Sequence, residues 1–248
     1  MRRPVSCAPL PGEDSSTSTV AHRHASTRRT RFRNRAEAGR FLAHELERYA
    51  GRDDLVVLAL PRGGVPVGSA LAQALRAPLD LFVVRKLGVP GHEELAMGAI
   101  AHGGLVILDQ DLVRQLGIPE AAIRRVIARE QRELERREAA YRGDREPPSL
   151  EGKTLILVDD GLATGATMRA AALAGREQNP ARVIVAVPVA SPQTCEAFRG
   201  DVDEIVCALT PEPFYAVGVW YDDFSQTTDE EVRELLAGTA GAAKEPSR

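Results

Sequence analysis

The chain has 248 residues, of which 44% are hydrophobic, and a formal net charge of −3. This length suits one substantial α/β core with room for a small subdomain. The near-neutral charge gives no general attraction to nucleic acid, and no apolar run approaches the ~18 residues of a membrane span. Three scattered cysteines, Cys7, Cys195 and Cys207, suit neither a zinc site nor a disulfide framework, which favours a reducing, cytoplasmic location.

The first 35 residues differ in composition from the rest of the chain. They hold eight arginines, many Ser and Thr, and only two acids, Glu13 and Asp14. This mimics a transit peptide but lacks its amphipathic stripe. We expect residues 1–31 to be a disordered basic tail, native or the product of an early start codon, and residues 238–248 to be loose. A single domain is expected over residues 32–237.

Apolar runs alternate with helical patterns through this domain. The first helix is expected to begin at Asn34, with Glu37 in a capping arrangement, and to end at Gly51. A polar, glycine-rich insertion covers residues 85–104. Alternating strands and helices predict an α/β fold with a central, mainly parallel sheet and helices on both faces. Strands are expected at residues 55–60, 79–84, 105–108, 155–158, 183–187 and 205–208, and later helices at 67–75, 119–141, 168–178, 193–198 and 229–236.

Residues 155–167 are the most informative stretch. Four apolar residues, typical of a buried parallel strand, run into Asp159 and Asp160 and then into small or hydroxyl residues. Gly161, Gly165 and Ala166 let backbone N–H groups approach an anion, while Thr164 and Thr167 add hydroxyl donors. The expected helix that follows directs its positive end at the same place. The pattern indicates a phosphate site beside two carboxylates.

Three alternatives fit this stretch less well. A Walker phosphate loop needs a Lys where Ala166 stands. A dinucleotide-binding fold needs an acid near the end of the next strand, which instead ends in Pro188. A strand ending in two solvated Asp before a capped helix explains the acids but not the run of small residues and Thr.

The stretch resembles the PRPP-binding motif of the type I phosphoribosyltransferases, in which hydrophobic residues precede two acids and a small-residue loop. All thirteen positions fit. The resemblance implies the family fold with a small hood, and 5-phosphoribosyl-1-pyrophosphate (PRPP) as ligand with Mg²⁺. It also implies that Asp159 and Asp160 hold the ribose hydroxyls and the metal, directly or through water, with Asp160 also counted as catalytic. The implied phosphate-binding residues are Ala163, Thr164, Gly165, Ala166 and Thr167.

The family's loop after the first sheet strand binds pyrophosphate, which assigns Arg62, Gly63 and Gly64 to that role here. Alone, this segment is better explained as an ordinary strand-to-helix turn with an exposed Arg, and the motif at residues 155–167 is what favours the functional interpretation. Arg85 and Lys86 are expected at the end of the second strand as catalytic cations that stabilise the departing pyrophosphate. Their alternative is two solvated charges at a strand end.

A flexible loop at about residues 85–104 resembles the family's lid, which excludes water from the reaction. His92 or Glu93 is a candidate for proton transfer within it. A hood including residues 211–224 is expected to hold the acceptor base, because five of the chain's eleven aromatic residues lie there. Tyr215 and Trp220 are the stacking candidates; the alternative is that these rings form the hood's own core.

Ala163 separates the chain from the 6-oxopurine salvage enzymes, which carry an Asp there. The chain looks closest to an uncharacterised bacterial branch of the family. We expect an enzyme of nucleotide salvage that transfers phosphoribosyl to a planar nitrogen base and releases pyrophosphate, without nucleic-acid or membrane partners, as a homodimer. The alternative is a PRPP- or nucleotide-sensing regulator on the same fold, which the basic tail favours slightly.

Overall fold

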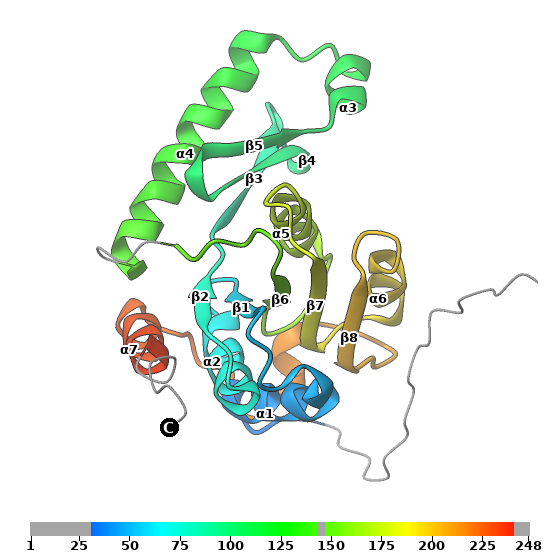
Figure 1. The fold of residues 1–248 in the computed structure, drawn as a ribbon. Helices are drawn as coiled ribbons and strands as arrows, with labels where there is room; N and C mark the ends of the chain where they lie inside the picture. Colours follow the sequence, from blue (N-terminus) through cyan, green and yellow to red (C-terminus); the bar gives the residue numbers. More distant parts are fainter. Residues whose placement is uncertain (1–30, 143–146, 241–248) are drawn as a thin grey trace, which may run out of the picture.

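The fold is built on a central sheet of five parallel strands, shown in the computed structural model for residues 31–142 and 147–240 (Figure 1). Their nearly continuous apolar sequences reflect burial on both faces of the sheet. In spatial order the strands are β2 (Leu79–Leu81), β1 (Leu55–Ala59), β6 (Thr154–Val158), β7 (Arg182–Val189) and β8 (Glu204–Leu209).

Helices cover both faces of this sheet, which confirms the predicted α/β class. One face packs on α1 (Arg35–Glu45), α2 (Gly64–Leu75) and α7 (Asp229–Ala240). The other packs on α5 (Ala166–Arg176) and α6 (Pro192–Phe198). Alternate residues of each strand point to opposite faces of the sheet. Val57 packs in the core with α1, α2 and α7, and Val56 packs in the core with α5 and α6. Among the described residues, no helix combines the length and apolar character needed to cross a membrane.

The strand order reverses between β1 and β6. From β1 the chain passes through α2 to β2 on one side, and from β6 it passes through α5, β7 and α6 to β8 on the other. The two central strands pair in register, with Ala59 beside Val158. The segments that leave their carboxyl ends therefore diverge to opposite faces, and such a switch point is where open α/β sheets bind ligands.

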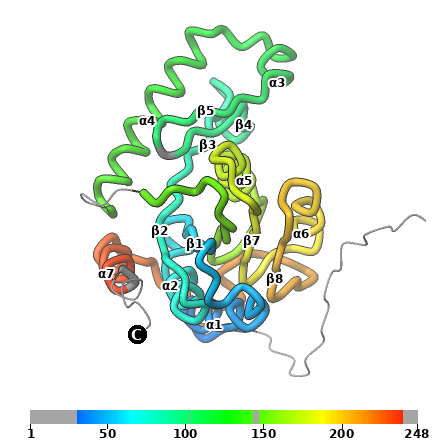
Figure 2. Tube along the Cα trace, viewed as in Figure 1, coloured from blue at the N-terminus to red at the C-terminus, as the bar shows by residue number. Residues whose placement is uncertain are grey.

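A second sheet replaces the expected flexible insertion. It is antiparallel and consists of β3 (Val84–Val89), β4 (His92–Ala101) and β5 (Leu105–Leu108). It lies between α5 and the long helix α4 (Glu120–Arg142), as Figures 1 and 2 show. Its two faces contribute to different cores, with Leu87 facing α4 and Ala99 facing α5. The expectation of one loop over residues 85–104 was therefore wrong.

The insertion pairs as a hairpin because Gly91 takes a positive φ of 81° at the turn. The expected strand over 79–84 is split, since β2 ends at Leu81 and Val84 already belongs to β3. A short helix, α3 (Gln110–Gln115), was not expected; Asp109 caps it by accepting from the backbone N–H of Leu112.

The first helix begins as predicted after Asn34, whose side chain accepts from the backbone N–H of Glu37 at 3.0 Å. In the part of the chain that the structure describes, three short 3₁₀ segments connect longer elements: η1 (Glu47–Tyr49), η2 (His102–Gly104) and η3 (Val217–Trp220). Residues 238–240, expected to be loose, continue α7. The expected tails at 1–30 and 241–248 lie outside the described residues.

Candidate functional site

Asp159 and Asp160 leave the carboxyl end of β6 at the switch point. The Asp159 carboxylate accepts from the backbone N–H of Asp160 at 2.8 Å, which fixes the two acids side by side. Burial, together with the negative charge of Asp160, raises the pKa of Asp159 well above its ordinary value. Burial also raises the pKa of Asp160, although the nearby Arg35 opposes that shift. The pair is therefore a site that favours a cation or hydroxyl donors.

The loop that follows has the geometry of an anion site. Gly165 takes a positive φ of 73° immediately before α5, and a Cβ there would lie 2.6 Å from the Phe198 ring. Thr164 and Thr167 are exposed on either side of it. The first-turn N–H groups of α5 add the positive end of the helix. The residues predicted to bind the 5-phosphate thus form one continuous turn.

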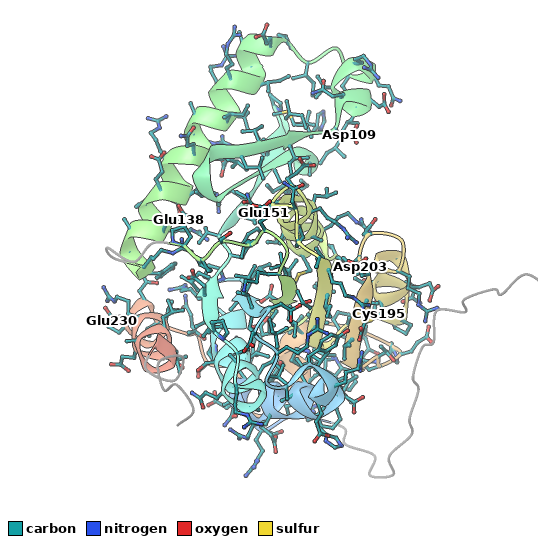
Figure 3. All side chains as sticks on the ribbon, viewed as in Figure 1. Asp109, Glu138, Glu151, Cys195, Asp203 and Glu230 are labelled. Atoms are coloured by element: carbon teal, nitrogen blue, oxygen red, sulfur yellow. A yellow bond between two sulfur atoms is a disulfide. The ribbon has the colours of Figure 1, made fainter. Side chains whose placement is uncertain are left out.

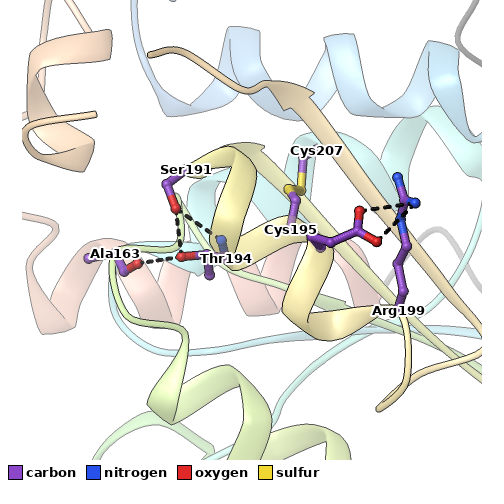
Figure 4. Close-up of a disulfide and its surroundings, with 7 residues drawn as sticks. Ala163, Ser191, Thr194, Cys195, Arg199 and Cys207 are labelled. Atoms are coloured by element: carbon purple, nitrogen blue, oxygen red, sulfur yellow. Dashed lines mark hydrogen bonds and ion pairs between the residues drawn. A yellow bond between two sulfur atoms is a disulfide. The ribbon is translucent and has the colours of Figure 1, made fainter. Parts of the chain in front are cut away.

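Helix α6 supports this loop from behind (Figure 4). Thr194 donates its hydroxyl to the carbonyl oxygen of Ala163 at 2.9 Å, and Ser191 caps the helix by accepting from the backbone N–H of Thr194 at 3.0 Å. The next residue, Cys195, forms a disulfide with Cys207 on β8. The sequence did not indicate this pairing, because its three scattered cysteines suggested no disulfide framework. The chain folds back between α6 and β8, and this brings together two cysteines that lie 12 residues apart in sequence.

The predicted pyrophosphate loop touches the acid pair directly. A Cβ at Gly63 would lie 2.1 Å from Oδ2 of Asp160, and one at Gly64 would lie 2.6 Å from the carbonyl oxygen of Val158. The peptide bond between Pro61 and Arg62 is cis. Only glycine allows this close approach, so the two loops form one surface.

Arg62 extends from the same loop toward α7. Its guanidinium lies 3.4 Å from the Asp229 carboxylate, which also accepts from the Tyr141 hydroxyl at 3.0 Å. A cavity of about 270 Å³ opens at Arg62 and is lined further by residues 226–230. The Arg62 side chain is a third exposed, so it borders solvent beside the loop.

Arg85 and Lys86 lie on β3 of the small sheet, and each has a partner there. Arg85 is bound to the buried Glu130 of α4. The Lys86 amino group lies 3.2 Å from the carbonyl oxygen of Glu94 on the neighbouring strand. His92 and Glu93 are exposed at the hairpin turn. These side-chain contacts of Arg85 and Lys86 thus lie within the small sheet and with α4, and not with the two loops.

The hood places its two stacking candidates differently. Tyr215 is 79% exposed. Trp220 is half-buried in a small core with Phe32, Phe214 and Tyr221, and its carbonyl oxygen accepts from the backbone N–H of Phe32. Trp220 thus belongs to the hood's own packing, which the sequence left open as an alternative.

Arg35, the first residue of α1, is a site residue that the sequence did not indicate. Its Nε and Nη2 lie 2.9 and 2.8 Å from Oδ2 of Asp160. Its guanidinium also lies 3.9 Å above the centre of the Phe224 ring. The hydroxyl of Tyr221 donates to the carbonyl oxygen of Asp160 at 2.6 Å. No local signal marks Arg35, because 125 residues separate it from Asp160.

Outside the two loops, the long helix α4 carries many charged side chains of both signs. Figure 3 shows charged side chains along α4, where Glu138 is labelled, and these fit the mixed-sign helix expected there. Within residues 31–142 and 147–240, no group of three or more His, Cys, Asp or Glu side chains could hold a metal ion.

Known proteins are similar to this chain in sequence and in fold. A family model described as "Phosphoribosyl transferase domain" matches residues 30–219. Two Mycobacterium tuberculosis proteins, "Putative phosphoribosyl transferase MT0597" and "Putative phosphoribosyl transferase Rv0571c", are each 43% identical over 224 residues, which cover 87% of this chain and 50% of theirs. The chain thus spans about half the length of these curated relatives.

The crystal structure of TT1426 from Thermus thermophilus is also similar, with 41% identity and a TM-score of 0.78. The match covers 84% of this chain and 99% of that chain. The residues matched by the family model include both loops of the switch point, the acid pair and the small sheet. The chain belongs to the phosphoribosyl transferase domain family.

Proposed function

We propose that the protein is a phosphoribosyltransferase that uses PRPP and Mg²⁺ to transfer phosphoribosyl to a nitrogen heterocycle. The observation that carries this proposal is the contact between Gly63 and the Asp160 carboxylate at the switch point. Gly63 belongs to the loop proposed to bind pyrophosphate and Asp160 to the pair proposed to bind the ribose, and the turn proposed to bind the 5-phosphate follows that pair in the chain. These are the three parts needed to hold PRPP.

Each part has a chemical role in the proposed reaction. The turn at residues 163–167 binds the 5-phosphate through backbone N–H groups and the Thr164 and Thr167 hydroxyls. Asp159 and Asp160 accept hydrogen bonds from the ribose hydroxyls. The bond from ribose C1 to the pyrophosphate oxygen breaks, and pyrophosphate leaves with the electron pair. A bond forms from C1 to the acceptor nitrogen, which then loses its proton.

The acid pair also fits a magnesium ion that is held mainly by the substrate. Mg²⁺ in such sites takes one or two carboxylates together with substrate oxygens and waters. Asp159 and Asp160 supply two adjacent carboxylates. Mg²⁺, when bound, neutralises negative charge on the pyrophosphate.

The hood is the proposed acceptor site, with the exposed Tyr215 as its stacking ring. We assign the product to nucleotide salvage, because a preformed base and PRPP together give a nucleotide. Arg85 and Lys86 have partners in α4 and in the small sheet. We propose that a movement of the small sheet toward the two loops brings them to the leaving pyrophosphate.

Pyrophosphate release from PRPP and Mg²⁺, screened across purine, pyrimidine and other heterocyclic bases, tests the function. We expect one base class to give turnover and Asp160→Asn to abolish it. Asp53→Asn, which changes an exposed carboxylate just before β1 and outside the proposed site, is the control. PRPP binding without turnover of any base would instead favour the PRPP-sensing regulator.

A further inference from the structure

Arg35 joins three parts of the site that come from distant segments of the chain. Two nitrogens of its guanidinium contact Oδ2 of Asp160, after β6. The third, Nη1, donates to the carbonyl oxygen of Ser225 in the hood at 2.7 Å. The guanidinium carbon Cζ lies over the Phe224 ring, 3.9 Å from its centre. One side chain of α1 thus contacts both the ribose-binding acid and the hood.

Burial makes these contacts stronger than those of a surface ion pair. The Arg35 side chain is 11% exposed and that of Asp160 is 16% exposed. Charge-assisted hydrogen bonds in such surroundings are shorter and stronger than neutral ones. The planar guanidinium can hold a carboxylate and stack on a ring at the same time, which a lysine ammonium cannot do.

The contacts also decide which oxygen of Asp160 is free for a substrate. Both guanidinium contacts fall on Oδ2, and Gly63 packs against the same oxygen. Oδ1 is therefore the oxygen left to accept from a ribose hydroxyl. The backbone of Asp160 is held as well, because its carbonyl oxygen accepts from the hood residue Tyr221.

We propose that Arg35 is a positioning residue that couples Asp160 to the hood, an inference that rests on the proposed function. It orients Asp160 toward the ribose, and it transmits ribose binding to Phe224 and Ser225. A ribose hydroxyl that donates to Oδ1 of Asp160 further orders the carboxylate that Arg35 already holds through Oδ2. The guanidinium passes this ordering on to Phe224 and Ser225, so the acceptor site changes when PRPP binds.

Trp220 provides a direct readout of this coupling. It is the only tryptophan of the chain and is half-buried in the hood. We expect PRPP to change the emission of Trp220 in the wild-type protein. In Arg35→Ala, ribose 5-phosphate should bind at least about tenfold more weakly, the size of one charge-assisted hydrogen bond. Inorganic phosphate should bind this variant as it binds the wild type, because the phosphate turn is untouched.

Three further variants separate the coupling from a loss of fold. Arg40→Ala, on an exposed position of the same helix, should behave as wild type in both measurements. Arg35→Lys should keep part of the preference for ribose 5-phosphate over phosphate. Phe224→Leu should keep that preference but lose the emission response to PRPP, and it carries the test if Arg35→Ala does not fold.

The outcomes distinguish this inference from the proposed function. Wild-type protein that fails to bind PRPP overturns the proposed function and the inference with it. Wild-type protein that binds PRPP, together with an Arg35→Ala variant that keeps both the ribose preference and the Trp220 response, overturns the inference alone. An unchanged Trp220 response in Phe224→Leu overturns the coupling to the hood.

Discussion

Arg85 on β3 donates two hydrogen bonds to one carboxylate oxygen of Glu130 on α4, from Nε at 2.9 Å and Nη2 at 2.6 Å. The Glu130 side chain is 8% exposed, and Arg129 contacts its other oxygen. This buried ion pair ties the small sheet to the long helix. The contact gives Arg85 a structural role beside the catalytic one that the sequence predicts for Arg85 and Lys86 together.

Arg85→Ala should lower the free energy of unfolding at pH 7 by up to about 3 kcal/mol, because it leaves a buried carboxylate with one partner fewer. Arg129 remains, which keeps the cost at the low end for a broken buried pair. Urea titrations measure the change. Glu120→Gln, which breaks an exposed pair with Arg124 on the same helix, should change it by less than about 1 kcal/mol. An equally small effect of Arg85→Ala would contradict a stabilising role.

The same pair predicts how stability depends on pH. Burial would raise the pKa of Glu130, but hydrogen bonds from Arg85 and Arg129 more than offset it and lower the pKa below its ordinary value. The native state thus binds fewer protons than the unfolded state. The stability that the ion pair contributes is complete above the pKa that Glu130 has in the unfolded state. It is lost as the pH falls through the lower pKa that Glu130 has in the folded state. Between pH 6 and about pH 3, the unfolding free energy of Glu130→Gln should fall less than that of the wild type.

A paired replacement separates the two roles of Arg85. Replacing both Arg85 and Glu130 by leucine should restore much of the stability, because apolar residues often substitute for a buried pair at little cost. Full turnover in this double variant would make Arg85 purely structural. Turnover lost despite restored stability would support the catalytic role.

The phosphate turn predicts that Thr164→Val combined with Thr167→Val weakens PRPP binding by about tenfold or more, because two hydroxyl donors to a charged phosphate are removed. Both side chains are exposed, so the fold should be unaffected. Calorimetric titration with PRPP measures the effect. Thr210→Val, another exposed threonine, is the control. Unchanged affinity in the folded double variant would refute the assignment of the turn.

The acid pair predicts that Mg²⁺ binds weakly to the free protein and more tightly with PRPP present. Two carboxylates alone supply few of the six ligands that Mg²⁺ requires, whereas PRPP adds phosphate and hydroxyl oxygens. Titration calorimetry with and without PRPP checks this difference. Asp159→Asn should remove most of the PRPP-dependent gain, since one of the two carboxylates is lost. Tight Mg²⁺ binding by the free wild-type protein would count against the picture.

The sequence predicts the central sheet well because its signals are local. Runs such as residues 155–158 are apolar at every position, and this is characteristic of strands covered on both faces. The acid pair and the glycine turn follow such a strand directly. Their shared location at the switch point follows from the parallel arrangement alone.

The parts that the sequence did not predict depend on contacts between distant segments. Gly98 interrupts the apolar residues of β4, so residues 85–104 look like a loop until β3 and β5 pair with β4. Arg35 meets Asp160 only after α1 packs onto the sheet. Cys195 and Cys207 meet only because α6 folds against β8. None of these contacts leaves a periodic or compositional trace.

Lys86 remains the predicted group for the departing pyrophosphate. Lys86→Ala should lower turnover more than PRPP affinity, because a charge that acts on the leaving group stabilises the transition state more than the ground state. Steady-state kinetics and PRPP titrations separate the two effects. Lys153→Ala is the control. Lys153 lies directly before β6, and its amino group contacts the carbonyl oxygen of Asp53. If affinity falls while turnover is kept, Lys86 is a binding group.

The acceptor should be a planar heterocycle other than a 6-oxopurine. Ala163 stands where the 6-oxopurine enzymes carry an Asp, and it therefore offers no carboxylate to take the purine proton. Hypoxanthine or guanine would have to lose that proton to water or to an exposed residue such as Glu93. A positioned general base typically contributes about 10²–10⁴-fold, so adenine, a pyrimidine or another amine-bearing ring should be used far better.

Steady-state kinetics across these bases test this choice, and Ala163→Asp provides a gain-of-function comparison. Thr194 donates to the backbone carbonyl oxygen of Ala163, so a longer side chain at this exposed position leaves that hydrogen bond in place. The new carboxylate should raise kcat/KM for hypoxanthine and guanine relative to adenine, because it supplies the missing proton acceptor. Efficient use of guanine or hypoxanthine by the wild-type protein would refute the argument, since the proton would then have another acceptor.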